Sequence, residues 1–343
     1  VLANGNINSV EKAKEVMGNK CRVCRDCNGL VCRGEVPGAG GKGTGAGFIR
    51  NRQKVQEVKI HLDTIVPVKD INTSIELFGH SLDFPFLAAP IGGLELNYNT
   101  YLDDLAYSRA IVGGCKEAGV MGCTGDGVGE GNFEIPLDVI EEYEGFGIPT
   151  VKPWANEEII EKIKKAEEVG VPAVAIDIDA AGLINLALLG KPVGTKSIED
   201  LREIIDSTSL PVILKGIMTV EGAKKAIKAG AKGIVVSNHG GRVLDHTLST
   251  IELLPQIAAE VRGKLKIFID GGFRDGSDVF KALALGADAV LIGRPYAIAA
   301  YGGGLEGVKL YSQKVGHELK EAMIMAGCHE IQEIGSKHVS ISF

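Results

Sequence analysis

Short apolar runs recur along the chain from about residue 85 onward, and each of them ends in glycine, proline or a polar residue. The runs are rich in β-branched and other apolar residues, without alternation between an apolar and a polar face. Parallel strands that are buried on both faces have this pattern. Eight such runs are found, at residues 84–93, 118–127, 147–154, 171–180, 210–217, 231–241, 265–273 and 287–295.

Segments with helical periodicity separate most of these runs. In residues 156–170, Ile159, Ile160 and Ile163 fall on one helical face, and Gly170 is a stop signal. Eight strand–helix units predict a (β/α)8 TIM barrel, an α/β fold. The alternative is a doubly wound open sheet, which is less favoured because no G-x-G-x-x-G sequence follows the first strand. Two further helical segments, which begin with Thr or Asp and end with Gly, lie at 219–230 and 275–286.

Residues 1–80 do not follow this alternation and are predicted to form an N-terminal extension that caps the barrel formed by residues 81–343. The extension contains a Cys- and Gly-rich part, including a glycine-rich loop at 34–48. Short antiparallel strands are expected after it. These strands are predicted at 58–68 and 73–83. A core helix is predicted at 182–190 and a C-terminal helix at 305–327.

Composition narrows the classes of protein that the chain can belong to. It has 343 residues, 45% of them hydrophobic, and a net charge of -7, so nucleic-acid binding has no electrostatic support. No apolar run approaches 18 residues, so no membrane span is expected. The first 20 residues are polar and lack the apolar region of a signal peptide. Seven cysteines, an odd number, do not indicate a secreted disulfide framework, and we expect a cytoplasmic protein.

The carboxyl ends of the predicted strands carry most of the residues that can do chemistry. In TIM barrels the active site lies at these ends. They hold a lysine on each of two strands, several carboxylates, one histidine and two arginines. The residues are Pro90, Ile91, Gly92, Cys123, Thr124, Lys152, Asp177, Asp179, Lys215, Ser237, Asn238, His239, Asp270, Gly271, Gly272, Arg274, Gly293 and Arg294.

The last two strand ends each combine glycine with arginine. The backbone N–H groups of Gly272 and Gly293 can approach a ligand closely, and Arg274 and Arg294 add positive charge. The loops after strands seven and eight are the usual phosphate site of this fold, and a helix N-terminus adds its dipole. The sequence therefore predicts a phosphate site, although turn-forming glycines and surface-paired arginines are the alternative.

His239 lies between a strand end and a Gly-Gly turn, and Arg242 follows three residues later. A histidine base beside an arginine that can bind a carboxylate forms a compact catalytic unit. The alternative is a structural histidine that is held by hydrogen bonds. Lys215 ends an apolar strand, where a buried ammonium needs an anionic partner.

Several of these segments together resemble the family of FMN-dependent α-hydroxy acid oxidases and dehydrogenases, which includes glycolate oxidase and lactate oxidase. The resemblance extends from about residue 82 to the C-terminus. It implies an FMN-binding barrel that oxidises a small 2-hydroxy acid to a 2-oxo acid, with the flavin reoxidised by oxygen or another acceptor. It also implies a homotetramer or higher homo-oligomer. The matching segments are 215–217, 237–245, 270–288 and 292–295.

The resemblance also implies roles for individual residues. His239 would be the base, Asp179 would hold its imidazole, and Arg242 would bind the substrate carboxylate. Lys215 would stabilise negative charge on the reduced flavin. The implied FMN contacts are Pro90, Ile91 and Gly92 at the ring face, Thr124 at the ring edge, Lys152, Lys215 and Ser237, and Asp270, Gly271, Gly272, Arg274, Gly293 and Arg294 toward the phosphate.

Other positions depart from the family pattern. The third strand end lacks the usual tyrosine, and Lys152 stands there in a flavin-facing position. Asp177 replaces a usual threonine, and no second arginine follows it. Cys32 lies near the place of an N-terminal tyrosine. Lys152 and Asp177 are expected to pair or to touch the substrate. Because the substrate contacts are altered, the alternative is an FMN enzyme with another substrate, such as an isomerase resembling type 2 isopentenyl diphosphate isomerase. A third possibility is a non-catalytic protein that binds flavin or phosphate.

Four cysteines near the N-terminus have the spacing C-x2-C-x2-C-x4-C: Cys21, Cys24, Cys27 and Cys32. Four such thiolates can bind zinc or an iron–sulfur cluster. The bacterial ferredoxin run differs, because its last gap is three residues and proline follows. We favour free or redox-active thiols over a metal. The other three cysteines are expected in the core.

Overall fold

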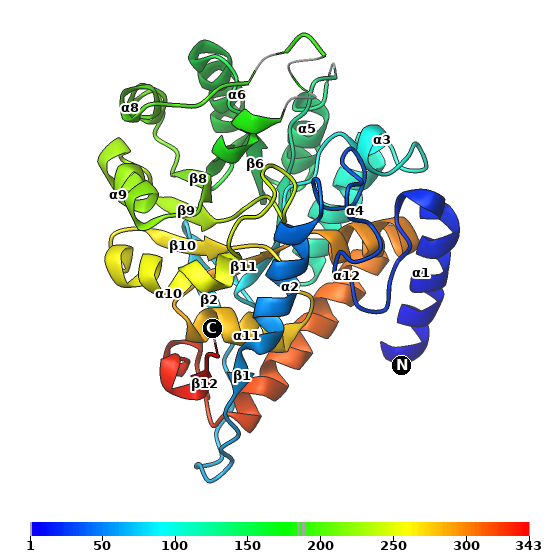
Figure 1. Ribbon diagram of the computed structural model, residues 1–343, viewed down its shortest axis with the longest axis vertical. Helices are drawn as coiled ribbons and strands as arrows, with labels where there is room; N and C mark the ends of the chain where they lie inside the picture. The colour runs from blue at the N-terminus through cyan, green and yellow to red at the C-terminus, as the bar shows by residue number, and fades with distance from the viewer. Residues whose placement is uncertain (1, 130, 184–185, 187–188, 192, 343) are drawn as a thin grey trace.

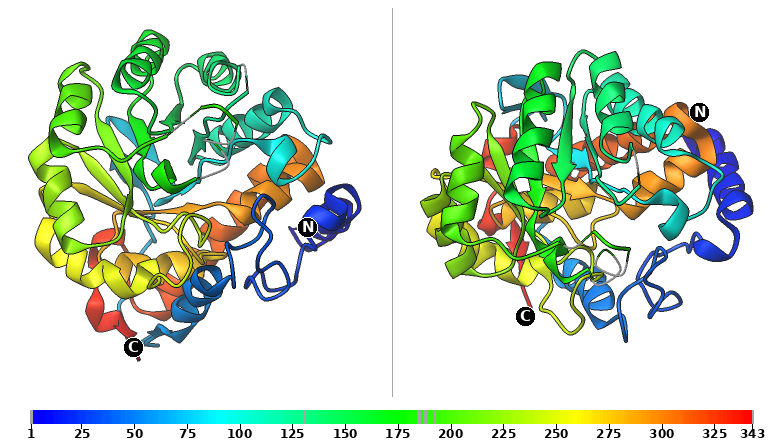
Figure 2. Two further views of the ribbon diagram at one scale, coloured as in Figure 1. Left: turned by 45° about the horizontal axis from the view of Figure 1, so that its top comes forward. Right: turned by 90° about the horizontal axis from the view of Figure 1, so that it is seen from above.

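The computed structural model describes residues 2–129, 131–183, 186, 189–191 and 193–342. Eight parallel strands close into a barrel that helices surround (Figures 1 and 2). The predicted TIM barrel is therefore confirmed and the open-sheet alternative is wrong. In barrel order the strands are β4 (Phe86–Ala88), β5 (Met121–Thr124), β6 (Gly147–Val151), β7 (Val174–Asp177), β8 (Val212–Ile217), β9 (Gly233–Val236), β10 (Lys266–Ile269) and β11 (Ala289–Ile292).

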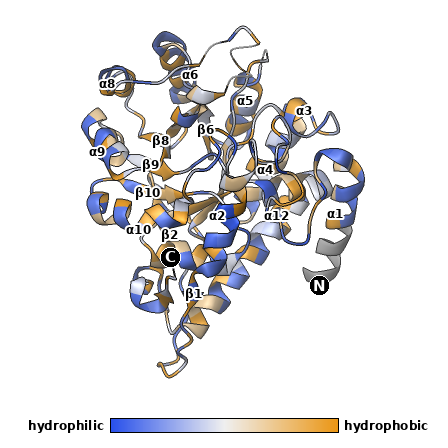
Figure 3. Ribbon diagram, in the orientation of Figure 1, coloured by the Kyte–Doolittle hydropathy of each residue, from blue (hydrophilic) through white to orange (hydrophobic). Residues whose placement is uncertain are grey.

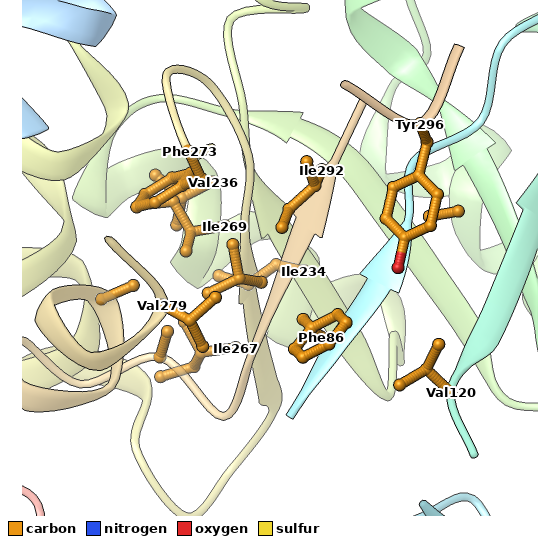
Figure 4. Close-up of a cluster of buried hydrophobic side chains, with 14 of the residues drawn as sticks. Phe86, Val120, Ile234, Val236, Ile267, Ile269, Phe273, Val279, Ile292 and Tyr296 are labelled. Carbon is orange, nitrogen blue, oxygen red and sulfur yellow. The ribbon is translucent and has the colours of Figure 1, made fainter. Parts of the chain in front are cut away.

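The strands are apolar on both faces because each face has its own core. Inside the barrel, one cluster takes a side chain from every strand, with Ile213, Val235 and Phe268 among its buried members. The outward side chains, such as Ile234 and Ile269, pack beneath the helices, as Figure 4 shows. This burial on both sides explains why the strands read as continuous apolar runs.

Helices follow the strands around the outside of the barrel, and the three segments with predicted helical periodicity are helices. Several show hydrophilic and hydrophobic residues on opposite sides (Figure 3). Thr219 and Asp275 cap two of them by accepting hydrogen bonds from Gly222 N and Asp278 N. The helices are α3 (Leu94–Asn97), α4 (Asp104–Glu117), α5 (Glu134–Glu142), α6 (Asn156–Val169), α8 (Ile198–Asp206), α9 (Val220–Ala229), α10 (Thr250–Val261), α11 (Gly276–Ala284) and α12 (Arg294–Met325).

The last helix is longer than the sequence predicts. α12 begins at Arg294, directly after β11, and includes the predicted segment 305–327 almost completely. Gly304 interrupts it with φ 57°, a conformation that glycine adopts without a steric penalty. The sequence prediction therefore found only the part that follows this break. No helix in the described part of the chain is both long and apolar enough to cross a membrane.

The N-terminal region contacts both ends of the barrel. α1 (Leu2–Met17) lies beside α12, and α2 (Ala46–Glu57) lies beside α10 and α11. The hairpin of β2 (Ile75–Leu77) and β3 (His80–Leu82) is antiparallel, as predicted. Its leucines pack into the core inside the barrel.

The prediction of a strand over residues 58–68 is wrong for most of its length. Only β1 (Lys59–Ile60) is a strand, and it pairs with β12 (Val339–Ser340) from the far end of the chain. Its partner lies some 280 residues away, so local pattern alone could not show where the strand ends. The core helix predicted at 182–190 falls partly outside the described residues; before it, a 3-10 helix spans Ile178–Gly182.

Candidate active site

The carboxyl ends of the strands surround a cavity of about 1380 Å³, including the space that opens to solvent. Most of the strand-end residues that the sequence singles out line it. They include Pro90, Ile91, Gly92, Lys152, Asp177, Lys215, His239, Arg242, Asp270, Gly271, Gly272, Arg274, Gly293 and Arg294.

Asp177 bridges two lysines at the floor of this cavity. It is the last residue of β7 and is in register with Lys215 on β8, so the parallel pairing brings the two side chains together. Lys215 Nζ lies 2.8 Å from Asp177 Oδ1, and Lys152 Nζ lies 2.5 Å from Asp177 Oδ2. The Lys152–Asp177 pair is therefore present. The three side chains form what we call the Asp177 cluster.

The Asp177 cluster fixes charges in a buried place. Asp177 and Lys215 are 2% and 4% exposed, so neither charge could persist there alone. Burial opposes ionisation of Asp177, but the neighbouring His239, Lys152 and Lys215 hold its pKa well below the usual range. Burial likewise disfavours the Lys215 ammonium, yet Asp177, Asp179 and Asp270 raise the pKa of Lys215. Both groups therefore stay charged at neutral pH.

His239 is held so that one ring nitrogen is free to act. Its backbone has φ 57°, and its N–H donates to Ser237 Oγ at 3.0 Å. The Nδ1 atom lies 3.0 Å from Asp179 Oδ1 and 3.4 Å from Asp177 Oδ1. Two carboxylates at Nδ1 favour the tautomer that carries the proton there, which leaves the Nε2 lone pair available as a base.

Asp177, Asp179 and His239 also place three potential ligand atoms within 4.8 Å of one another. The Lys215 ammonium already supplies a positive charge to this group, because Nζ lies 2.8 Å from Asp177 and 3.8 Å from Asp179. Burial raises the pKa of Asp179, and Lys215 and His239 oppose that rise. We therefore interpret the three residues as a hydrogen-bonded catalytic group.

Arg242 is positioned to receive an anion. Its Nη1 donates to the carbonyl oxygens of Gly38 and Gly40, and its Nη2 donates to Asn97 Oδ1 at 2.7 Å. Within the described residues, Arg242 has no carboxylate partner and its Nε–H has no acceptor. Burial and the nearby Arg294 lower the pKa of Arg242 to about 10, so the guanidinium stays charged at neutral pH. The Nε edge can therefore bind a carboxylate.

Arg274 and Arg294, the predicted phosphate ligands, lie at the ends of β10 and β11. Arg274 donates to Cys27 O at 2.7 Å, and Arg294 donates to Ala39 O at 2.7 Å. The Arg294 guanidinium also lies 3.6 Å from the centre of the Phe48 ring. In the described part of the chain, neither arginine meets a carboxylate, and burial lowers the pKa of Arg294. The charge of this pair is therefore available to a phosphate.

The cavity suits FMN in two further respects. Gly272 has φ 98°, and a Cβ atom there would lie 2.5 Å from Asn51 O, so the backbone stays bare beside the arginines. Asp270 Oδ1 and Thr150 Oγ1 are buried without a hydrogen-bond partner among the described residues. The ribityl hydroxyls and ring polar groups of FMN would satisfy such atoms, since buried polar groups are normally paired.

Two predicted cofactor contacts lie behind the cavity wall. Thr124 is buried at the end of β5, and Gly125 and Asp126 line the cavity next to it. Ser237 is also buried, where it donates to Asp270 Oδ2 at 2.9 Å and accepts from His239 N. Ser237 is thus placed to support the histidine. Direct contact of Thr124 or Ser237 with the cofactor stays a prediction.

Asp126 was not found from the sequence. Its buried carboxylate accepts hydrogen bonds from Trp154 Nε1 at 2.6 Å, Lys162 Nζ at 2.9 Å and the backbone of Lys152 at 3.0 Å. It therefore fixes the end of β6, from which Lys152 projects. An aspartate two residues after a buried strand was the available signal, but its partners lie on a different strand–helix unit.

Comparison with known proteins agrees with this geometry. The sequence profile of the FMN-dependent dehydrogenase family matches residues 38–187 and 188–341. The chain is 32% identical over 329 residues to 4-hydroxymandelate oxidase from Amycolatopsis orientalis, covering 85% of this chain and 89% of that protein. It is 35% identical over 271 residues to L-lactate oxidase from Lactobacillus jensenii, covering 74% and 57%.

The fold comparison gives the same result. The crystal structure of mandelate oxidase with (S)-2-phenylpropionate superimposes with a TM-score of 0.80 at 28% sequence identity, and 98% of each chain is covered. A structure of mandelate oxidase with benzoyl-formic acid gives a TM-score of 0.80 at 29% identity. The similarity thus includes the N-terminal region as well as the barrel.

Replacing Arg274 and Arg294 together with alanine should release FMN. A hydrogen bond to a charged group contributes about 1.5–3 kcal/mol, so losing both arginines should raise the dissociation constant by about 100-fold or more. The measurement is FMN per chain after gel filtration, with the dissociation constant obtained from flavin fluorescence. Exposed Arg262, next to the start of β10, provides the control Arg262→Ala. Full FMN occupancy in the double variant would rule out the phosphate assignment.

Proposed function

The chain belongs to the family of FMN-dependent dehydrogenases, and from this premise we propose that it oxidises a 2-hydroxy acid with a sizeable apolar side chain to the 2-oxo acid. The observation that carries the proposal is the placement of His239, backed by Asp179, beside Arg242 in one cavity. A base and a carboxylate-binding cation are what a 2-hydroxy acid requires. A protein that only stored flavin would need neither.

The residues have separate tasks in this reaction. Arg242 binds the substrate carboxylate and thereby directs the 2-hydroxyl group toward the histidine. His239 Nε2 takes the hydroxyl proton, and Asp179 stabilises the imidazolium that results. FMN, when bound, would accept the C2 hydrogen together with its bonding electron pair, a hydride equivalent, while the C2–O bond becomes a carbonyl. Lys215 keeps a positive charge beside the place where negative charge accumulates.

Four apolar side chains of the cavity lining support a larger substrate. They are Leu96, Val128, Leu183 and Leu186. Leu186 belongs to the stretch in which the family has a second arginine. Lys152, which also lines the cavity, is already paired with Asp177. Among the described residues, these four side chains offer no charge to a diphosphate, which disfavours the isomerase alternative.

The cellular setting of the enzyme follows from the sequence only. We propose that it acts in the cytoplasm and as a homo-oligomer. The seven cysteines, all of them free thiols, support the first proposal, and the family resemblance supports the second.

His239→Asn should leave FMN bound while abolishing flavin reduction by substrate. Asparagine retains polarity without a basic nitrogen, and general-base catalysis is worth about 100- to 10,000-fold in rate. The measurement is the anaerobic rate of flavin bleaching in a stopped-flow instrument. Asp179→Asn should lower the rate in the same direction, because the imidazolium loses its carboxylate. An unchanged bleaching rate in His239→Asn would eliminate it as the base.

A substrate panel tests the specificity proposal. Branched-alkyl or aryl 2-hydroxy acids should reduce the flavin at least about tenfold more efficiently than glycolate, because each buried methylene contributes about 0.8 kcal/mol. Leu183→Ala should reduce this advantage and leave glycolate unaffected, whereas Arg242→Lys should impair every substrate. If glycolate were the best substrate and Leu183→Ala had no effect, the apolar-wall proposal would be wrong.

A further inference from the structure

The four N-terminal cysteines lie on a segment that the proposed reaction does not use. Residues 21–45 contain no helix or strand, and such a long irregular segment in a compact protein usually has a function. Cys21, Cys24, Cys27 and Cys32 are all half-buried and none forms a disulfide. We call residues 21–32 the cysteine loop.

The backbone of the cysteine loop is strained at one informative position. Val23, between the first two cysteines, has φ 45° and is only 4% exposed. A positive φ at a buried β-branched residue is a genuine outlier, and such strain is concentrated at ligand-binding sites. The conformation directs the Val23 N–H toward the Cys21 sulfur, where it opposes the effect of burial on the thiol. The loop is thus shaped around its sulfurs.

The four sulfurs influence one another electrostatically. Cys21 lies close enough to Cys24, Cys27 and Cys32 for each of the three to act on its thiol. Cys32 is likewise a neighbour of Cys24, Cys27 and the Arg294 guanidinium. Four neighbouring thiols would repel one another as free thiolates. A cationic centre bound to all of them would remove that cost.

We propose that Cys21, Cys24, Cys27 and Cys32 hold a [4Fe–4S] cluster at the mouth of the flavin cavity. A zinc ion with Zn–S bonds of about 2.3 Å needs its sulfurs within roughly 4 Å of one another. Among the described residues, only the group around His239 places three such ligand atoms within 4.8 Å. No three of the four sulfurs lie that close. Four cysteines on one short segment are the ligand set of a [4Fe–4S] cluster, in which each sulfur binds a different iron.

Contacts connect the cysteine loop to the flavin cavity. Cys27 O accepts hydrogen bonds from Arg274, one of the two predicted phosphate ligands. Cys32 O accepts from Gly41 N at 3.3 Å, and the neighbouring Gly40 O accepts from Arg242 and Arg294. A cluster in this loop would therefore lie just beyond the arginines that face the cavity.

This position assigns the cluster an electron-transfer role, which rests on the proposed function. Oxidation of one 2-hydroxy acid releases two electrons and two protons. The cluster would carry the electrons outward singly, so each turnover reduces two molecules of a one-electron acceptor, such as a small redox protein, and the protons leave to solvent. The cluster site itself does not depend on the identity of the substrate.

The first experiment measures metal in the full-length holoprotein purified without oxygen. We expect about four iron and four acid-labile sulfide per chain, and an electron paramagnetic resonance signal after dithionite reduction. FMN is quantified separately after denaturation. Zinc without iron, or a protein with neither metal even after reconstitution with ferrous iron and sulfide, would overturn the proposal. So would a disulfide among the four cysteines in the anaerobically isolated protein.

The second experiment uses Cys24→Ala, with Cys328→Ala as the control because Cys328 is buried far along the chain. Cys24→Ala should lose most of its iron and retain FMN and substrate-driven flavin bleaching. Reoxidation of the reduced flavin in this variant by ferricenium, a one-electron dye, should slow by about tenfold or more. Full iron content in Cys24→Ala would contradict the site, and normal reoxidation after iron loss would contradict the electron-transfer role. Failure of bleaching in the wild type would instead refute the proposed function, while the iron analysis would still decide the cluster site.

Discussion

The buried contact between Asp177 and Lys215 is the interaction on which the active site depends. Parallel pairing of β7 with β8 places the two residues opposite each other, with both side chains almost completely buried. Each charge is stable there because the other is present, and breaking such a pair costs about 3–5 kcal/mol. Lys152 forms an ion pair with Oδ2 of Asp177, and His239 Nδ1 lies next to Oδ1. The barrel thus fixes a charge pattern before any ligand arrives.

The three arginines of the cavity are held by uncharged partners instead of carboxylates. Arg242, Arg274 and Arg294 are held by backbone carbonyls of the N-terminal region, and Asn97 adds one side-chain oxygen. Carbonyl groups orient a guanidinium without neutralising it. The extension therefore keeps three cations in position and leaves their charge for anionic ligands. The fold comparison, which includes this extension, is consistent with a role for it in the site.

The sequence predicted the barrel because burial on both faces leaves a strong local signal. It also indicated the strand-end residues, since parallel strands bring their carboxyl ends together regardless of the details of packing. It did not predict that carbonyls of residues 38–40 hold Arg242 and Arg294, because contacts across 200 residues leave no local pattern. It also missed Asp126, because the partners Trp154 and Lys162 lie on the next strand–helix unit.

The central claim is that the Asp177 cluster keeps a positive charge at Lys215 beside the bound flavin. The most direct test is the midpoint potential of bound FMN in the wild type and in Lys215→Met. Reduction adds negative charge, which a nearby ammonium stabilises, so the variant should have a potential lower by about 30 mV or more. That shift corresponds to roughly a tenfold change in the equilibrium constant of a two-electron couple. An unchanged potential in a variant that still binds FMN would contradict the account.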